Sequence, residues 1–431
     1  MSTRPTCALV LLCVVQGCER FAFMAMLPLF VLYLHHRRGF SEPSALLLIG
    51  VFQALSYFGG LPGGALTDRK LGAKTAIILG SALLALGYSV LALDRGSLLW
   101  PALGLLIAGH SFFKPSISAL LGALFTSTDA RQERSFLWQY LAINLGAMTG
   151  PLCAEWAGVG HHWDRLFLVA AAAMLVGAFT ISVGIRLVPS GESLTLARSS
   201  AAISSEEDRE RRSAVWLICA LAIVIWLTSQ QASSSLTLFA ESHTDRSLAV
   251  FGGSMAIGPA RFASLHGLLV LALLPLFMVI TARFRRRGTD PSTPVKMVWG
   301  YVATAAAFAL LAAAGLRGAD SSRVSPAWLG CCYLLLSIAE LLLGPLGMSL
   351  LTRVAPPQRT AQAVGLWYAA AAVGNIGVGA LGLLWGHWTN HCYFALLALL
   401  SLGAAVVLFT RVDWLGRLLS PSAAHGNGGA P

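Results

Sequence analysis

Four ionisable residues lie inside long apolar stretches of the 431-residue sequence. Glu19 and Arg20 share the first stretch, Lys114 stands in a later one, and Glu340 lies in the last third of the chain. At the centre of a membrane-spanning helix each charge costs roughly 2.5–3.5 kcal/mol, so such residues normally face a bundle interior or a watery cavity. A buried carboxylate beside Arg or Lys can exchange its salt bridge for a proton. We interpret the four residues as a charge network on an ion or substrate path; the alternative is a fixed ion-pair network that only joins helices.

Helical spacing places two more residues beside the first pair of charges. Gln16, Glu19, Arg20 and Phe23 stand at positions i, i+3, i+4 and i+7. Side chains at these spacings share one face of a helix. We therefore expect this face to line a cavity.

Two histidines add titratable groups to the set. His110 precedes Lys114 at i, i+4 and shares its helix face, and His266 lies in a later apolar stretch. Histidine is the side chain whose unperturbed pKa lies nearest working pH, so both are candidates for proton handling. A hydrogen-bonded packing histidine is the alternative for each.

The composition requires a membrane for these stretches. Hydrophobic residues make up 56% of the chain and charged residues only 11%, whereas a soluble domain carries roughly 25% charged residues. The mean hydropathy is +0.71. Apolar runs of about 20 residues recur along the chain, and each can cross a bilayer as a helix. The sequence predicts an all-α polytopic membrane protein whose first span is retained.

The apolar stretches predict twelve membrane-spanning helices in two sets of six. We expect an N-terminal six-helix half at 1–188, a cytoplasmic linker at 189–213, a C-terminal six-helix half at 214–412 and a disordered cytoplasmic tail at 413–431. Two such halves place a substrate site between them, near the bilayer midplane. The expected spans are about 7–34, 43–67, 75–94, 97–126, 135–160, 164–188, 214–241, 260–282, 294–316, 326–352, 360–386 and 391–412.

The distribution of basic residues predicts the orientation. With both termini in the cytoplasm, 20 of the 30 Lys and Arg residues fall on the cytoplasmic side and 8 on the outer side, while Arg20 and Lys114 lie within spans. This excess follows the positive-inside rule. It also explains the net charge of +11 without a nucleic-acid partner. We expect a multi-pass protein of the cell's inner (cytoplasmic) membrane.

Enzymatic chemistry has no support in the sequence. The eight cysteines form no CxxC pair or other metal-ligand spacing, and neither a nucleophile–base pair nor a nucleotide motif is present. We expect no enzyme, no metal and no cofactor, with the proton as the coupling ion.

A glycine-rich loop after the second stretch carries a known pattern. Gly64, Asp68, Arg69 and Gly72 match G-x-x-x-D-R-x-x-G. This loop resembles that of the major facilitator superfamily, which has twelve spans in two six-helix halves. The resemblance implies a conformational role for the loop.

Five further segments, in order along the chain, resemble the proton-dependent oligopeptide transporter (POT/PTR2) family within that superfamily. They are similar to the family's motifs in the first, fourth, fifth, seventh and tenth spans. The segments are "QGCERF" (16–21), "KPSISALLGALF" (114–125), "QYLAINLGA" (139–147), "SQQASSSLTLFA" (229–240) and "ELLLGP" (340–345).

The resemblance implies proton-coupled symport of di- and tripeptides by alternating access. Glu19 would couple protons, Arg20 and Lys114 would respond to the substrate carboxylate, and Glu340 would meet the amino end. Asn144 would hydrogen-bond the peptide backbone, and Trp367 would line a side-chain pocket. The full expected substrate site is Gln16, Arg20, Phe23, Lys114, Tyr140, Asn144, Gln231, Glu340 and Trp367. The expected proton-coupling residues are Glu19, His110, His266 and Glu340.

The chain departs from the family pattern at positions expected in the cavity. These departures remove acids, hydroxyls and an arginine, so we expect a less polar or differently charged substrate, or weaker proton coupling. His110 and His266 are hypothesised to replace the lost titratable groups. The departing residues are Gln16, Phe23, Met24, Leu27, Ser229, His266 and Gly344.

Two alternatives remain open at this point. One is a transporter of the same fold, including an exporter, for a non-peptide or modified-peptide solute with weakened proton coupling. The other is a membrane sensor that does not transport. The expected partners are a small peptide or peptide-like solute and the lipid bilayer, with the protein as a monomer.

Overall fold

The computed structural model describes residues 4–122, 124, 130–157, 162–188, 205–250, 253–319, 322–356 and 359–419, which are almost entirely helical. The α-helices are α1 (Arg4–Leu32), α2 (Glu42–Phe58), α3 (Gly60–Leu66), α4 (Ala73–Ala92), α5 (Leu99–Gly122), α6 (Ala130–Trp156), α7 (Trp163–Gly184), α8 (Ser205–Ser229), α9 (Ser235–Ser242), α10 (Pro259–Arg286), α11 (Thr293–Ala314), α12 (Pro326–Val354), α13 (Thr360–Gly382), α14 (Asn390–Phe409) and α15 (Val412–Leu419). Shorter 3-10 and π segments are η1 (Tyr33–Arg37), η2 (Thr67–Leu71), η3 (Gly96–Leu98), η4 (Gln230–Ser233) and η5 (Gly315–Ala319).

Each of the twelve expected spans corresponds to a helix or to a pair of consecutive helices. In the described ranges, 11 helical segments are long and apolar enough to cross a membrane. α6 occupies the fifth expected span but falls outside this set, because polar residues such as Gln139, Asn144 and Glu155 recur along its length. The prediction of an all-α membrane protein is confirmed. One short antiparallel hairpin was not expected; in it β1 (Ser247–Val250) pairs with β2 (Gly253–Ala256).

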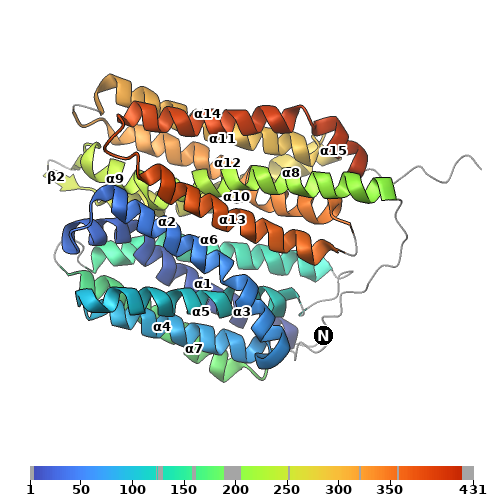
Figure 1. Ribbon diagram of the computed structural model, residues 1–431, viewed down its shortest axis with the longest axis horizontal. Helices are drawn as coiled ribbons and strands as arrows, with labels where there is room; N and C mark the ends of the chain where they lie inside the picture. Colours follow the sequence, from blue (N-terminus) through green and yellow to red (C-terminus); the bar gives the residue numbers. More distant parts are fainter. Residues whose placement is uncertain are drawn as a thin grey trace, which may run out of the picture.

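The helices pack as two halves that follow the order of the sequence. In Figure 1, α1–α7 form the blue-to-green half and α8–α14 the yellow-green-to-red half. Within the first half α1 packs on α6 and α7, and α4 packs on α5 and α7. Within the second, α11 packs on α12 and α14, and α8 packs on α13. Most of the close helix pairs therefore lie within one half, as the six-plus-six prediction required.

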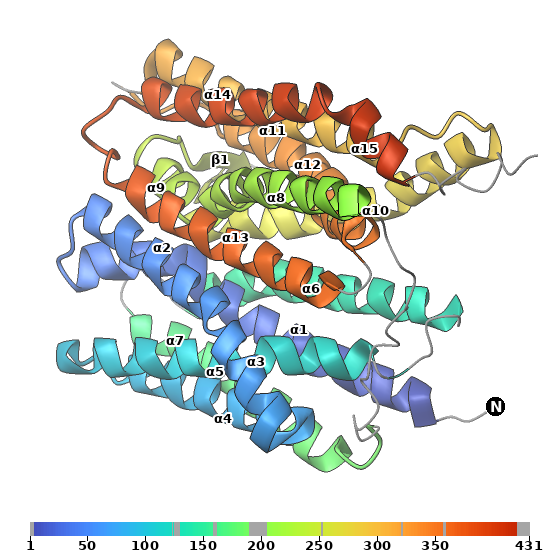
Figure 2. The same ribbon diagram turned by 45° about the vertical axis from the view of Figure 1, so that its right-hand side comes forward.

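The two ends of the bundle differ in how the halves meet. In Figure 2 the N-terminus and α15 lie at one end, called here the terminal end, while β1 and α9 lie at the other, the hairpin end. The main contacts between the halves are α2 with α13 and α6 with α10. A Cβ on Gly50 would lie 2.5 Å from the backbone N of Gly379, and one on Gly267 would lie 2.9 Å from the backbone N of Met148. Glycine therefore permits close backbone contact between the halves, on the hairpin side of each helix.

A broken helix brings polar backbone and side chains to the side of the second half that faces α1 of the first half. α8 ends at Ser229, the 3-10 turn η4 follows, and Ser234 has φ −135° and ψ −98° before α9 begins. A change from α to 3-10 winding alters which side chains face a given direction. Discontinuous membrane helices of this kind commonly form transporter binding sites.

Two expected segment boundaries need correction. α8 already begins at Ser205, so the last part of the expected linker is the first part of this helix, where Arg211 and Arg212 pair with Glu207 and Asp208 at i, i+4. The expected disordered tail starts with the helix α15, which buries Leu415 against α11 and α12. Residues 189–204 and 420–431 lie outside the described residues.

Candidate functional site

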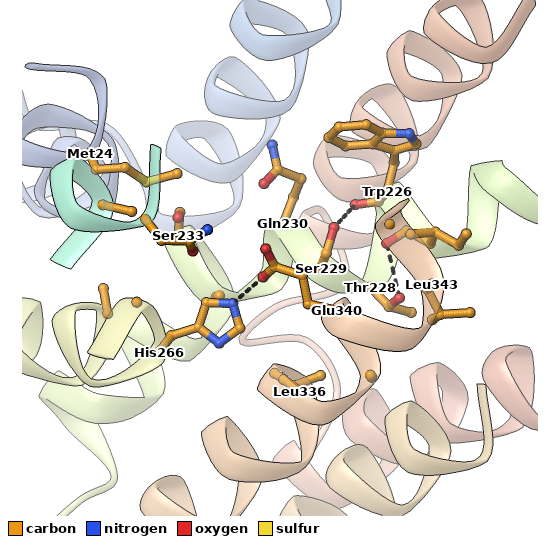
Figure 3. Close-up of a pocket in the computed structure, with 18 of the residues that line it drawn as sticks. Met24, Trp226, Thr228, Ser229, Gln230, Ser233, His266, Leu336, Glu340 and Leu343 are labelled. Carbon is orange, nitrogen blue, oxygen red and sulfur yellow. Dashed lines mark hydrogen bonds and ion pairs between the residues drawn. The ribbon is translucent and has the colours of Figure 1, made fainter. Parts of the chain in front are cut away.

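A cavity of about 260 Å³ lies between the halves and is lined by side chains of both. Figure 3 shows Met24 facing it from α1, and the residues around the α8–η4 break, His266 and Glu340 from the second half. Most of the lining is apolar, which is usual for a small-molecule site with a few fixed polar groups. Five of the expected site residues line this cavity: Arg20, Asn144, His266, Glu340 and Trp367.

The carboxylate of Glu340 is held by side chains from both halves. Nε2 of His266 lies 2.7 Å from its Oε2 (Figure 3), and the hydroxyl of Tyr140 lies 3.5 Å from its Oε1. The other ring nitrogen of His266, Nδ1, is 3.0 Å from Oγ of Ser337. Two expected residues, Tyr140 and His266, therefore act on a third, Glu340. Ser337 was not expected, although it stands at i−3 from Glu340 and so shares its face of α12.

The carboxylate of Glu19 forms a second charged centre within the first half. Glu19 is 1% exposed. Its Oε2 accepts a hydrogen bond from Nε2 of Gln16 at 3.2 Å and lies 4.0 Å from Nε of Arg20. Its Oε1 is 3.3 Å from Nδ1 of His110, close enough for an ion pair but without hydrogen-bond alignment. Each acid of the network therefore has a histidine neighbour, one in each half.

Lys114 is held by aromatic rings rather than by a carboxylate. Its Nζ lies 4.0 Å from the ring centroid of Tyr57 and 5.3 Å from that of Phe23, and makes no hydrogen bond. The Arg20 guanidinium also lies over Phe23, at 5.6 Å. Such cation–π contacts are worth about 2 kcal/mol when desolvated. The first half therefore carries its cations close to Glu19 without pairing all of them to it.

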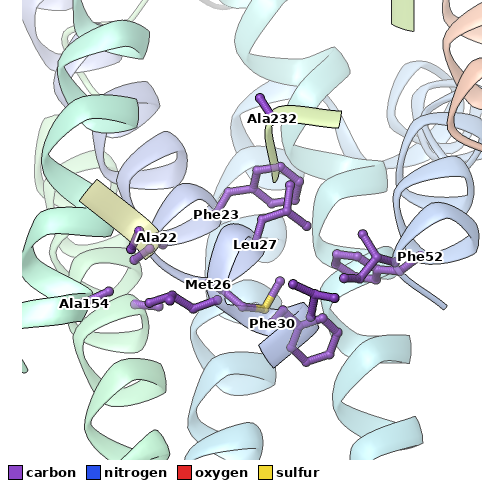
Figure 4. Close-up of a cluster of buried hydrophobic side chains, with 14 of the residues drawn as sticks. Ala22, Phe23, Met26, Leu27, Phe30, Phe52, Ala154 and Ala232 are labelled. Atoms are coloured by element: carbon purple, nitrogen blue, oxygen red, sulfur yellow. The ribbon is translucent and has the colours of Figure 1, made fainter. Parts of the chain in front are cut away.

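Gln16 and Phe23 were expected to line the cavity and do not. They are 4% and 1% exposed. Figure 4 shows Phe23 in an apolar cluster with Leu27, Phe30 and Phe52, and Ala232 of η4 lies nearby. The helix face was correct, but neighbouring helices cover these two positions, while Arg20 and Met24 reach the cavity.

Gln231 also lies away from the cavity. It is fully buried, and its Oε1 accepts hydrogen bonds from Tyr393 and Ser235 at 3.0 and 2.5 Å. The preceding residue, Gln230, lines the cavity instead and hydrogen-bonds Gln53 of the first half and Asn375 of the second. The 3-10 turn determines which of the two glutamines faces the cavity, and sequence spacing alone does not reveal this. Tyr57 and Trp226 also line the cavity and were not expected.

The glycine-rich loop lies apart from the cavity. Its residues Asp68 and Arg69 are exposed in the π segment η2, and Gly72 ends that segment with φ 71°, a conformation that favours glycine. Gly64 faces Pro115, since a Cβ there would lie 3.6 Å from the proline ring. The conformational role of the loop stays a prediction.

Two six-helix halves around a central cavity with a few charged and polar groups, and a broken helix in its wall, define a membrane transporter of the major facilitator fold. The chain belongs to the POT family, whose PTR2 profile matches residues 74–195 and 190–384. The sequence is 28% identical to the "Peptide transporter YePEPT" of Yersinia enterocolitica, over 86% of this chain and 85% of the relative. It is 26% identical to the "Di-/tripeptide transporter" of Lactococcus lactis, over 90% of this chain and 92% of the relative.

Solved structures agree with this fold. A crystal structure of the peptide transporter POT in complex with sulfate superimposes with a TM-score of 0.86, at 23% identity over 96% of each chain. The profile match confirms the predicted family, and the superposition confirms the predicted fold.

Proposed function

We propose that this protein is a secondary active transporter that carries di- and tripeptides across the membrane together with protons, by alternating access. The observation that carries the proposal is the pair of opposite charges on the cavity wall, Arg20 from the first half and Glu340 from the second. A zwitterionic peptide needs a cation at its carboxylate and a carboxylate at its ammonium group. The peptide substrates named for the relatives support the same conclusion.

The remaining cavity residues fit a substrate with variable side chains. Asn144 offers an amide to the peptide backbone, and Trp367, Leu336 and Leu343 offer apolar surface. In this proposal Lys114 acts on the carboxylate end indirectly, through the charge balance around Glu19 and Arg20. Tyr140 acts through Glu340.

Proton coupling is assigned to the two acid–histidine pairs, Glu19 with His110 and Glu340 with His266. A protonated histidine neutralises its carboxylate, so a proton changes the charge that each half presents at the interface. No cofactor other than the proton is proposed.

Access in this conformation is proposed to be from the terminal end, because the halves are joined at the hairpin end. Following the basic residues, we assign the terminal end and both termini to the cytoplasm and the protein to the inner membrane, as a monomer. Opening the hairpin end and closing the terminal end would give the alternate state, with the loop of Asp68 and Arg69 at the moving cytoplasmic surface. The relatives favour this function over a non-peptide substrate, a sensor or an enzyme.

Binding of blocked dipeptides to the purified protein tests the substrate class. Dialanine should raise the melting temperature, and both the N-acetylated and the amidated forms should do so less. Arg20→Gln and Glu340→Gln should each lose most of the dialanine effect, because each removes one terminal partner. The exposed controls Arg95→Gln and Glu210→Gln should retain it. If dialanine raises the melting temperature of the wild type and of both cavity variants equally, the proposal is overturned.

A further inference from the structure

The Ser337 hydroxyl lies within reach of two acceptors. Its Oγ is 2.7 Å from the carbonyl oxygen of Tyr333 and 3.0 Å from Nδ1 of His266; a third contact, to the carbonyl oxygen of His266, is longer at 3.4 Å. Ser337 is fully buried, so water does not compete for its proton. Because a hydroxyl carries one proton, it can donate to only one of these acceptors at a time.

Each choice of acceptor fixes the protonation of the histidine. If Ser337 donates to Nδ1 of His266, the imidazole is neutral and its Nε2–H donates to Glu340 at 2.7 Å. If Ser337 donates to Tyr333, then Nδ1 must carry a proton and donate to Oγ. A lone pair on Nε2 would then repel the carboxylate oxygen, so a proton must also lie between Nε2 and Glu340. The second arrangement holds one proton more than the first.

We propose that Ser337, His266 and Glu340 form a proton-binding site, with Ser337 as the positioning residue that accepts the loaded histidine's Nδ1–H. On loading, one proton binds Nδ1, the Ser337 hydroxyl turns from Nδ1 to the carbonyl of Tyr333, and the Nε2–H stays on Glu340. No other bond changes, and the net charge of the His266–Glu340 pair rises from −1 to 0. This inference rests on the proposed proton-coupled transport and assigns one coupling proton to these atoms.

The surroundings connect this site to the contact between the halves. The titratable or charged groups near the pair, in the part of the chain that the structure describes, are Tyr140 on α6, Tyr333 on α12 and Arg20 on α1. Tyr140 reaches Glu340 from the opposite half at 3.5 Å. A carboxylate that shares its charge with an imidazolium is a weaker acceptor for this hydroxyl. Loading therefore weakens one contact that holds α6 against α12.

Histidine-selective ¹⁵N NMR of the protein in lipid nanodiscs tests the site, with His266→Gln to assign the signal. In wild type, acidification should convert His266 to the form with protons on both nitrogens. In Ser337→Ala this conversion should need a pH about one unit lower, because the loaded form loses one hydrogen-bond acceptor. Ser337→Thr keeps the hydroxyl and should convert near the wild-type pH.

Two results would overturn the proton site. One is conversion of Ser337→Ala at the wild-type pH. The other is an Nδ1 that stays unprotonated in wild type throughout the pH range in which uptake is proton-driven. Dialanine exchange by the wild type, measured in parallel, separates this from the proposed function: exchange without the NMR shift refutes only the site, whereas the NMR shift without any exchange refutes peptide transport and leaves the site standing.

Discussion

Glu155 on α6 pairs with Arg261 on α10 across the interface between the halves, with 2.7 Å between Oε1 and Nε. The carboxylate also lies against Gly258, the N-cap of α10, where a Cβ would overlap it. A carboxylate at a helix N-terminus is favoured by the orphan backbone N–H groups and by the helix dipole. Glu155 therefore joins the halves at the hairpin end in two ways.

Loss of this pair should loosen the hairpin end. Glu155→Gln should speed hydrogen exchange of the backbone amides at the start of α10 by roughly fivefold, since a partly exposed ion pair is worth about 1 kcal/mol. The charge swap Glu155→Arg with Arg261→Glu should restore only part of the protection, because Arg cannot accept from the N-terminus of α10. Unchanged exchange in Glu155→Gln would show that the pair does not hold the halves.

A single added methyl group between α2 and α13 should destabilise the protein. Gly50→Ala puts a Cβ 2.5 Å from the backbone N of Gly379, so the helices must separate, at about 1–3 kcal/mol. We expect a lower melting temperature in detergent. The matched control is Gly403→Ala on α14, where nothing lies within 4 Å of the added Cβ. Equal melting temperatures for the two variants would contradict the close approach.

Loss of His110 should reduce proton-driven dialanine uptake more than it reduces dialanine exchange across the membrane. His110→Phe leaves the ring volume against Phe23 but removes the nitrogen 3.3 Å from Glu19. We expect proton-driven dialanine uptake to fall about tenfold, as for loss of about 1.4 kcal/mol, and dialanine exchange to fall less. His162→Phe at an exposed position is the control. If His110→Phe and His266→Asn both leave proton-driven uptake unchanged, the histidines do not couple protons.

Whether ligand affinity rises or falls with pH should depend on the charge of the ligand. Loading the His266–Glu340 pair makes the cavity one charge more positive, since Arg20 keeps its charge. N-acetyl-dialanine, an anion, should bind more tightly as the pH falls, and dialanine amide, a cation, less tightly. One proton limits each slope to about tenfold per pH unit. Calorimetric titrations at several pH values would detect this, and parallel slopes for the two ligands would refute it.

Periodicity and composition were sufficient to predict the helices and most of the charge network. Long apolar runs have no stable alternative to a spanning helix, so twelve helices and two halves followed from the sequence. Arg20, Asn144, His266, Glu340 and Trp367 all line the cavity, as expected. Their positions follow from the helix faces and from the resemblance together.

The predictions were wrong where neighbouring elements determine which side chains reach the cavity. Helical spacing predicted the face of Gln16 and Phe23 but not the helices that cover it. The 3-10 turn η4 shifts the phase, so that Gln230 takes the position expected of Gln231. Nothing in the sequence around Ser337 indicates its role, because that role depends on His266 from another helix. Long-range packing of this kind cannot be obtained from the local sequence.

Uptake of radiolabelled dialanine into proteoliposomes tests the central claim most directly. Under an inward proton gradient the wild-type protein should accumulate dialanine above the external concentration, and a protonophore should abolish this accumulation. Glu340→Gln should reduce the initial rate at least tenfold, because the ammonium group and the coupling proton both lose their carboxylate, while Glu210→Gln should not. Wild-type vesicles that take up no more dialanine than protein-free vesicles, or full accumulation by Glu340→Gln, would contradict proton-coupled peptide transport through this cavity.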